Sequence, residues 1–346
     1  MPLSNCPDGR DASARRLRRR VLTAAALLLL AAAHAAAEPQ AGQAAGRSLI
    51  TTATGARLRE RPDTGAAEVG RLQLGLVVEE LERTAEASAV GSSQGHWHLV
   101  SAPGGARGWV FGSLVAPFDP AQRDATYVQL AARRVENAAA TFPELSELVR
   151  FLDRATKEVK GREALAELEL TRLVALGRTL ANIPLEELEK PPYKPLVSEY
   201  GPEIVYSEPA GQWFVRAERL WNLEKKYRGL PVAERAAWEA AQTPLPGECE
   251  GYLPCMLYRE AETAGRYLAL YPSGAHADAA LANLSESLGF VVEDMRGQNP
   301  VFEVPREDRA SFRKSVAELR AQLARVPAAR KAKALGQLDA IARRFP

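Results

Sequence analysis

The chain has 346 residues and a formal net charge of +2, with 45 Lys and Arg against 43 Asp and Glu. The basic excess lies in residues 1–37, because residues 38–346 hold 39 bases against 41 acids. A near-neutral body lacks the positive field that nucleic-acid binding requires, so we expect no nucleic-acid partner. At 46% hydrophobic and 25% charged residues the composition is that of a globular protein, and its length suggests about two domains.

Residues 1–37 have the three parts of a secretory signal peptide. A basic cluster at residues 15–20 precedes an apolar run at 21–33, and Ala35-Ala36-Ala37 provides a small-residue exit. The apolar run is shorter than the roughly 20 residues that span a bilayer as a helix. The sequence therefore predicts export to the periplasm or the medium. An uncleaved signal that anchors the chain in the membrane remains an alternative.

Two cysteines, Cys249 and Cys255, follow the signal and lie in a loop rich in Gly and Pro. In an oxidising compartment a close pair of this kind favours a structural disulfide. Free thiols are a second interpretation, and a redox or metal role is a third.

Residues 38–47 have the composition of a linker. From residue 48 to 118, short apolar segments alternate with Gly, Pro and polar turns, which is typical of a small β-barrel. The order and spacing of these segments resemble the bacterial SH3 domain. The resemblance rests on residues 56–62, 69–72, 74–75, 77–79, 97–100, 108–110 and 114–115.

Two features depart from the family pattern. Arg57 stands where the family usually has Asn, and residues 85–95 form an insertion before Trp97. The resemblance implies a noncatalytic module that docks on a peptide or a peptidoglycan component. It also implies core positions for Trp97 and Trp109, so we expect His98 and Phe111 to be the exposed ligand-binding candidates.

Residues 119–183 are predicted to form a helical subdomain. Asp119 can cap a helix that begins at Pro120, and Thr141 with Glu144 has the spacing of a capping box. A third, Leu-rich helix is expected at about residues 162–183. Residues 184–208 then contain several prolines and three tyrosines, which predicts an extended, ordered connection rather than a long helix. A polyproline ligand is the alternative interpretation.

Residues 209–346 are predicted to be a helical repeat-like domain. A repeat with an offset of 44 residues relates Ala217 to Ala261 and Tyr227 to Tyr271, and each copy indicates two helices joined by a Gly/Pro turn. Residues 209–290 resemble tetratricopeptide-like hairpins, which would make this part a stack of helix pairs. The cysteine loop lies between the two copies.

A final helical hairpin is predicted to begin at about Phe312, with Pro327 starting its second helix. Residues 320–344 carry seven basic side chains against Asp339. A solvated helix face is the main interpretation. Contact with anionic lipid or wall polymer is the alternative, so membrane contact is expected only through this hairpin or an uncleaved signal.

The sequence supplies few groups suited to catalysis or metal binding. After the signal the histidines are His96, His98 and His276, and no further metal ligands stand near them, so we predict no metal, no cofactor and no catalytic residue. Glu286, between two serines, resembles the Glu-Ser of helical wall glycosidases, although the surrounding sequence does not.

Together these observations predict a multidomain chain, a small all-β SH3-like barrel followed by an all-α region. The expected function is an exported, noncatalytic envelope protein whose barrel docks on a peptide or a peptidoglycan component and whose helical repeats bind a protein partner. The expected partners are therefore an envelope protein or a peptidoglycan peptide. The alternative is a peptidoglycan hydrolase whose helical catalytic region is targeted by the barrel. The sequence does not determine the oligomeric state.

Overall fold

The structure, a computed structural model, describes residues 46–346. The predicted signal peptide and most of the predicted linker lie outside the described residues. Within residues 46–346, no helix is both long and apolar enough to cross a membrane.

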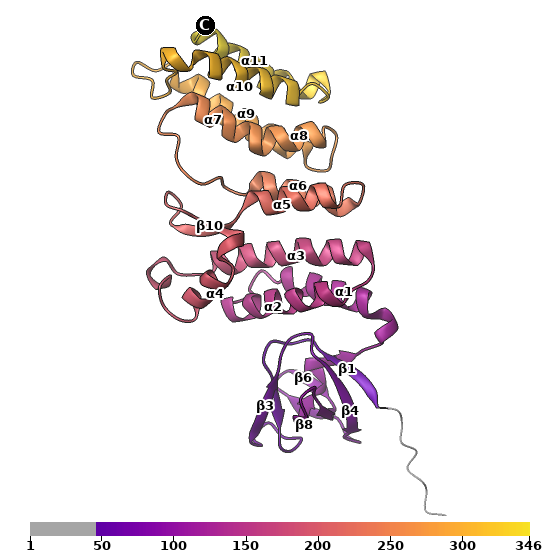
Figure 1. Cartoon of the computed structure of the whole chain (residues 1–346). Coiled ribbons are helices and arrows are strands. Elements are labelled where there is room, and N and C mark those ends of the chain that lie inside the picture. Colours follow the sequence, from indigo (N-terminus) through magenta and orange to yellow (C-terminus); the bar gives the residue numbers. More distant parts are fainter. Residues whose placement is uncertain (1–45) are drawn as a thin grey trace, which may run out of the picture. The chain divides into compact units, whose positions relative to one another are not determined.

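Residues 47–117 form a seven-stranded antiparallel sheet with the strand order β3-β2-β8-β7-β4-β1-β9, drawn in indigo and purple in Figure 1. Two short strands, β5 and β6, form a separate hairpin. The strands are β1 (Arg47–Thr51), β2 (Ala56–Arg59), β3 (Glu68–Leu72), β4 (Val77–Arg83), β5 (Ser88–Val90), β6 (Ser93–Gly95), β7 (Trp97–Ser101), β8 (Arg107–Phe111) and β9 (Val115–Pro117).

Alternation along the strands directs one set of apolar side chains into a common core. Val100 and Val110 are both fully buried there, and Leu58 and Leu72 reach the same core from β2 and β3. The opposite set includes Trp97 and Phe111, which face each other in the β7–β8 register. The sheet thus has a core on one face and an aromatic pair on the other.

The insertion at residues 85–95 folds as the β5–β6 hairpin and covers the Trp97–Phe111 pair. A side chain at Gly95 would stand only 3.3 Å from Phe111 Cζ, so the hairpin backbone lies directly on that ring. The insertion therefore buries aromatic side chains that would otherwise face solvent.

The sheet domain also contacts the helix α2 (Phe142–Glu158). The Leu74 N–H donates to Glu147 Oε1 at 2.6 Å, and the Arg154 guanidinium donates to the Leu74 carbonyl at 2.9 Å. Gly75 adopts φ +73°, and a Cβ there would lie 2.1 Å from the Phe151 ring. Both the positive φ and the close approach require glycine at this position.

The remainder of the chain is mainly helical (Figure 1). In chain order the helices are α1 (Arg123–Val135), α2, α3 (Arg162–Ala181), α4 (Tyr193–Glu199), α5 (Ala217–Lys226), α6 (Pro231–Gln242), α7 (Leu253–Glu260), α8 (Arg266–Leu270), α9 (Ala277–Asp294), α10 (Arg309–Gln322) and α11 (Ala328–Arg344).

The predicted helix starts at residues 119 and 141 are present. Asp119 Oδ1 accepts the Ala121 N–H at 2.9 Å and so caps a short 3-10 helix, Pro120–Gln122, that leads into α1. Glu144 Oε2 accepts the Thr141 N–H at 2.9 Å, which is one half of the capping box at the start of α2. The pKa of Glu144 is lowered first by the hydrogen bond from the Thr141 N–H and then by the one from the Thr141 hydroxyl.

The proline-rich segment contains structure that the sequence did not predict. Its prolines lie around the short helix α4, and it ends in a strand, β10 (Ile204–Ser207). That strand pairs antiparallel with β11 (Gln212–Val215), which lies in the part that was predicted to be helical. The region after the sheet domain is therefore not purely α-helical. The hairpin is held by ladder bonds and by α3, a long-range partner that local proline content does not reveal.

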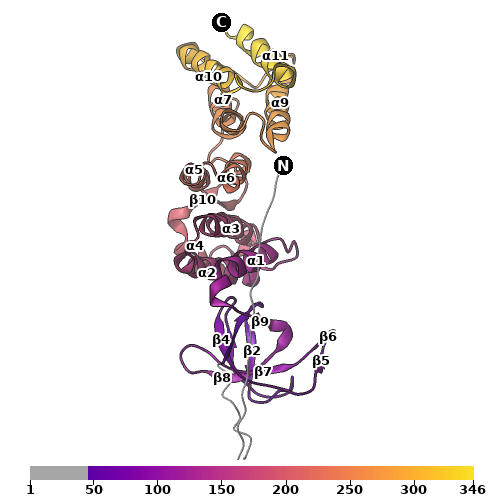
Figure 2. The same ribbon diagram turned by 90° about the vertical axis from the view of Figure 1, so that its right-hand side faces the viewer.

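The two copies of the repeat form helical pairs, whose helices are seen end-on in Figure 2. In the first, α5 packs on α6; in the second, α7 and α8 are joined through a π-helical turn at Ala261–Gly265 and pack near α9. Tyrosines of the second copy bond to buried or half-buried acids of the first. Tyr267 Oη donates to Glu234 Oε1 at 2.8 Å, and Tyr271 Oη donates to Glu224 Oε1 at 3.2 Å.

We expect Tyr267→Phe to lower the free energy of unfolding by about 1–2 kcal/mol, because the Tyr267 side chain is fully buried and Glu234 would lose a donor. Urea denaturation monitored by circular dichroism measures the change. Tyr258→Phe is the matched control, since Tyr258 is 58% exposed. Equal stability of the two variants would contradict a role for this bond in joining the copies.

Candidate functional site

A small cavity of about 240 Å³ opens on the sheet domain beside the aromatic pair. It combines apolar side chains, three hydroxyl groups and two arginines, and its lining holds no acidic residue. The lining residues are Thr54, Gly55, Ala56, Arg57, Arg59, Thr64, Val90, Trp97, Phe111, Ser113 and Leu114.

The two arginines are only partly neutralised by the protein. Arg57 Nε lies 3.4 Å from Glu68 Oε2, but Glu68 is bound more closely by Arg71 at 2.6 Å. The hydrogen bond from Arg71 is the main reason that the pKa of Glu68 is lowered. Arg59 Nη1 donates to the Ala66 carbonyl at 2.7 Å, a neutral acceptor. The cavity therefore presents positive charge to a ligand.

Phe111 is not exposed, which corrects the expectation from the sequence. Its side chain is 3% exposed and packs edge-on against Trp97, with ring centroids 5.3 Å apart. Trp109, expected in the core, is instead half-buried on the same face of β8. The β5–β6 hairpin accounts for the burial of Phe111, because the hairpin backbone at Gly95 lies on its ring. Phe111 nevertheless lines the cavity.

His98 is also largely enclosed. Its side chain is 13% exposed, and Nδ1 lies 2.6 Å from Glu80 Oε1 on the neighbouring strand β4. Its neighbour His96 contacts a different group, with Nδ1 2.8 Å from the Thr84 carbonyl. His98 is not part of the cavity lining. Among residues 46–346 no group of three or more His, Cys, Asp or Glu side chains is placed to bind a metal ion.

Cys249 and Cys255 are joined by a disulfide, the first of the three interpretations of the pair. Cys249 lies in the loop between α6 and α7, and Cys255 lies in the first turn of α7. The Arg259 guanidinium of α7 donates to the carbonyls of Pro246 and Gly247, both at 3.1 Å. The disulfide and this arginine together tie the loop to the second copy of the repeat.

In the basic C-terminal hairpin, four of the seven basic side chains donate hydrogen bonds to other groups of the chain. Arg320 pairs with Asp339, and Arg330 Nε donates to Asp278 Oδ1 at 2.6 Å. Arg325 donates to the Ala269 carbonyl, and Lys331 to the carbonyls of Leu323 and Ala324. Two of these bases pair with carboxylates, whereas the carbonyl partners of Arg325 and Lys331 leave their positive charge in place.

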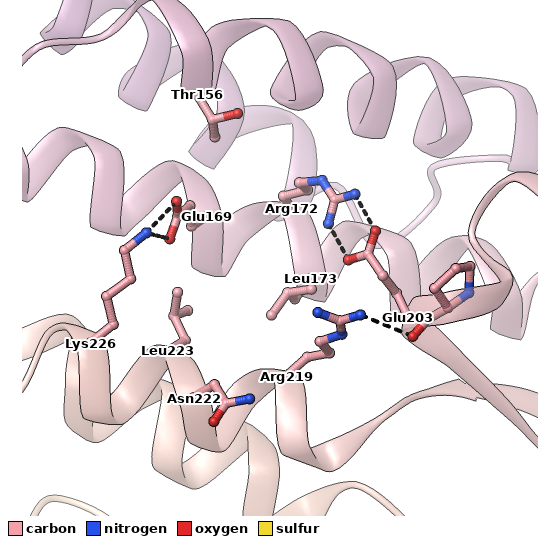
Figure 3. Close-up of a pocket in the computed structure, with 10 residues that line it drawn as sticks. Thr156, Glu169, Arg172, Leu173, Glu203, Arg219, Asn222, Leu223 and Lys226 are labelled. Atoms are coloured by element: carbon pink, nitrogen blue, oxygen red, sulfur yellow. Dashed lines mark hydrogen bonds and ion pairs between the residues drawn. The ribbon is translucent and has the colours of Figure 1, made fainter.

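A larger cleft, of about 520 Å³, lies between α3 and α5 (Figure 3). This cleft was not predicted from the sequence, because its residues come from four separate segments. They are Thr156, Glu169, Arg172, Leu173, Pro202, Glu203, Arg219, Asn222, Leu223 and Lys226.

Arg172 organises one wall of this cleft. Its Nη1 and Nη2 donate to the two oxygens of Glu203, each at 2.7 Å, and its Nε donates to Asp153. Burial alone would lower the pKa of Arg172, but the bonds to Glu203 and Asp153 outweigh it and raise the pKa. Tyr200 Oη donates to the other oxygen of Asp153 at 2.6 Å, and burial followed by this bond raises the pKa of Tyr200.

We expect Arg172→Met to lower the free energy of unfolding by about 2–4 kcal/mol, because it leaves two partly buried carboxylates without their cation. Urea denaturation checks the value. The control is Arg313→Met on the exposed face of α10, which should change stability by no more than about 0.5 kcal/mol. A similar small change in both variants would show that Arg172 does not hold the wall together.

Comparison with known proteins bears on the sheet domain. The family model of the bacterial SH3 domain matches residues 54–116, most of the seven-stranded sheet and all of the cavity lining. No match to the chain was found among curated proteins or among solved structures. Bacterial SH3 domains commonly bind peptidoglycan or peptides, and they often occur in extracellular or envelope proteins. Residues 54–116 of this chain form a bacterial SH3 domain, which a helical region follows.

Proposed function

We propose that this chain is an exported, noncatalytic protein of the cell envelope. Its SH3 domain docks on a peptide, with the peptide part of peptidoglycan as the preferred ligand, and its helical region binds a partner protein. The presence of a bacterial SH3 domain supports a binding module of this kind. The signal-like residues 1–37 and the disulfide support export.

The cavity beside Trp97 is the single observation that carries the proposed ligand. Both departures from the family pattern contribute to it, Arg57 directly and the insertion through Val90. A guanidinium pairs well with a carboxylate, and a volume of about 240 Å³ suits a small group rather than a long side chain. The peptide end that fits best is therefore a small residue bearing a free carboxylate. Peptidoglycan peptides have this chemistry.

We expect Arg59→Ala to weaken binding of residues 38–346 to purified wall sacculi by about tenfold, because a charge-assisted hydrogen bond to the ligand is lost. A sedimentation assay with increasing protein concentration measures the affinity. The effect should shrink at high salt, since screening weakens the pairing of Arg59 with an exposed carboxylate.

Arg107→Ala provides the matched control, because Arg107 is exposed on β8 of the same domain and does not line the cavity. Loss of binding in both variants would indicate a general charge effect. Undiminished binding of Arg59→Ala would contradict the cavity as the docking site.

The absence of catalysis is part of the proposal and has its own test. Glu286 is exposed on α9, whereas a general acid of a glycosidase usually sits where burial raises its pKa. Nearby Glu260 does have a raised pKa, chiefly through burial, although a hydrogen bond with Ser287 opposes the shift.

We expect residues 38–346 to release no soluble fragments from purified sacculi, and Glu286→Gln and Glu260→Gln to behave as the parent does. Chromatography of the supernatant after incubation measures release. Fragment release that either substitution abolishes would replace the binding proposal with the hydrolase alternative.

A further inference from the structure

The cleft between α3 and α5 has features of a second binding site. It lies in the helical region, and its lining shares no residue with the SH3 cavity. Figure 3 shows basic and acidic side chains around its rim, with Leu173 and Leu223 between them. Such a mixture of an apolar floor and a few polar groups is typical of ligand sites.

Most of the charges around the cleft are already paired. Both terminal nitrogens of Arg172 bind Glu203, and Lys226 Nζ donates to the two oxygens of Glu169 at 2.7 and 2.8 Å. Arg172 also binds Asp153, so each of the two cations is already paired with at least one carboxylate. These pairs shape the walls of the cleft and leave little charge for a ligand.

Arg219 is the exception. Its Nη2 donates to the Pro202 carbonyl at 3.0 Å, and among the described residues it forms no ion pair. It is exposed on α5, and Asn222 lies three residues further along the same helix face. Asn222 is exposed and lines the cleft, so its side-chain amide can both donate to and accept from a ligand.

We propose that this cleft binds a short peptide segment of a partner protein through one carboxylate. Arg219 pairs with the carboxylate, and Asn222 hydrogen-bonds to the peptide backbone. Leu173 and Leu223 receive an adjacent apolar side chain. This inference rests on the proposed function, because it names the site and the chemistry by which the helical region holds a partner protein.

The charge of the cleft favours a single carboxylate over a phosphate or polyphosphate. Three basic and two acidic side chains line it, and Asp153 just outside the lining shares Arg172 with Glu203, so among the described residues Arg219 is the one lining base that no carboxylate pairs with. A ligand with several negative charges would be repelled by Glu169 and Glu203. The volume, about 520 Å³ against about 240 Å³ for the SH3 cavity, suits a peptide segment rather than one small group.

The test is an NMR titration of residues 38–346, which include the whole compact unit from residue 44 onward. The probes are acetyl-Leu-Leu-Glu with a free C-terminus, the same peptide amidated at its C-terminus, and an amidated acetyl-Leu-Leu-Gln. We expect saturable shifts of the Asn222 side-chain amide and of backbone amides on α3 and α5 with the first peptide. The neutral third peptide should cause none.

The amidated Glu peptide distinguishes the two sources of the carboxylate. Shifts with this peptide assign the site to an acidic side chain, and their loss assigns it to a chain terminus. Arg219→Ala should weaken binding of the active probe by about tenfold, and Asn222→Asp by a similar factor through repulsion. Lys225→Ala, which removes a positive charge from the same helix outside the cleft, should leave the affinity unchanged.

Two results would overturn the inference. One is the absence of shifts at Asn222 with any carboxylate peptide at about 5 mM, well into the range of weak binding. The other is equal binding of the neutral peptide or of Arg219→Ala. Binding of Arg219→Ala to sacculi tests the proposed function separately, because sacculus binding depends on the SH3 cavity. If this variant binds sacculi normally while the peptides fail to bind the cleft, only the further inference is overturned.

Discussion

The bonds of Arg172 tie together parts of the helical region that are far apart in the sequence. A single guanidinium on α3 joins Asp153 of α2 to Glu203 beside the β10 strand, and Tyr200 completes the set through Asp153. These bonds hold residues 184–208 in position, the segment that connects the helical subdomain to the first repeat copy. They also build one wall of the α3–α5 cleft, so the cleft depends on the same bonds that organise the fold. A mostly enclosed guanidinium can do this because its planar donors serve two carboxylates at once.

In the SH3 domain the candidate site is formed jointly by residues of the family pattern and by the two departures from it. The shared positions build the sheet and its core, and two of them, Arg59 and Trp97, also line the cavity. Arg57 and the inserted hairpin lie on the other face, where they surround Trp97 and Phe111. The insertion therefore has a double effect, because it shields an aromatic pair from water and at the same time forms part of a cavity. Positive charge at the rim then gives that cavity a preference for anionic groups.

Much of the fold was predictable because it rests on local signals. Helix starts at Asp119 and Thr141 follow from capping residues whose partners lie within three positions. The 44-residue repeat gave the two helical pairs, since periodic apolar residues mark the faces that pack. The β10–β11 hairpin was missed because its stability comes from pairing and packing with α3, which proline content conceals. Whether the helical pairs form a tetratricopeptide-type stack remains a prediction.

The sequence by itself determined the division into an SH3-like domain and a helical region, and the proximity of the two cysteines. These features depend on residue type, spacing and short-range geometry. Only the tertiary structure decided which side chains are accessible. Phe111 and His98 were expected on the surface, yet one is covered by the inserted hairpin and the other is held by Glu80. The pairing that leaves Arg219 available was equally hidden, because the partners of Arg172 and Lys226 come from segments that meet only in the folded chain.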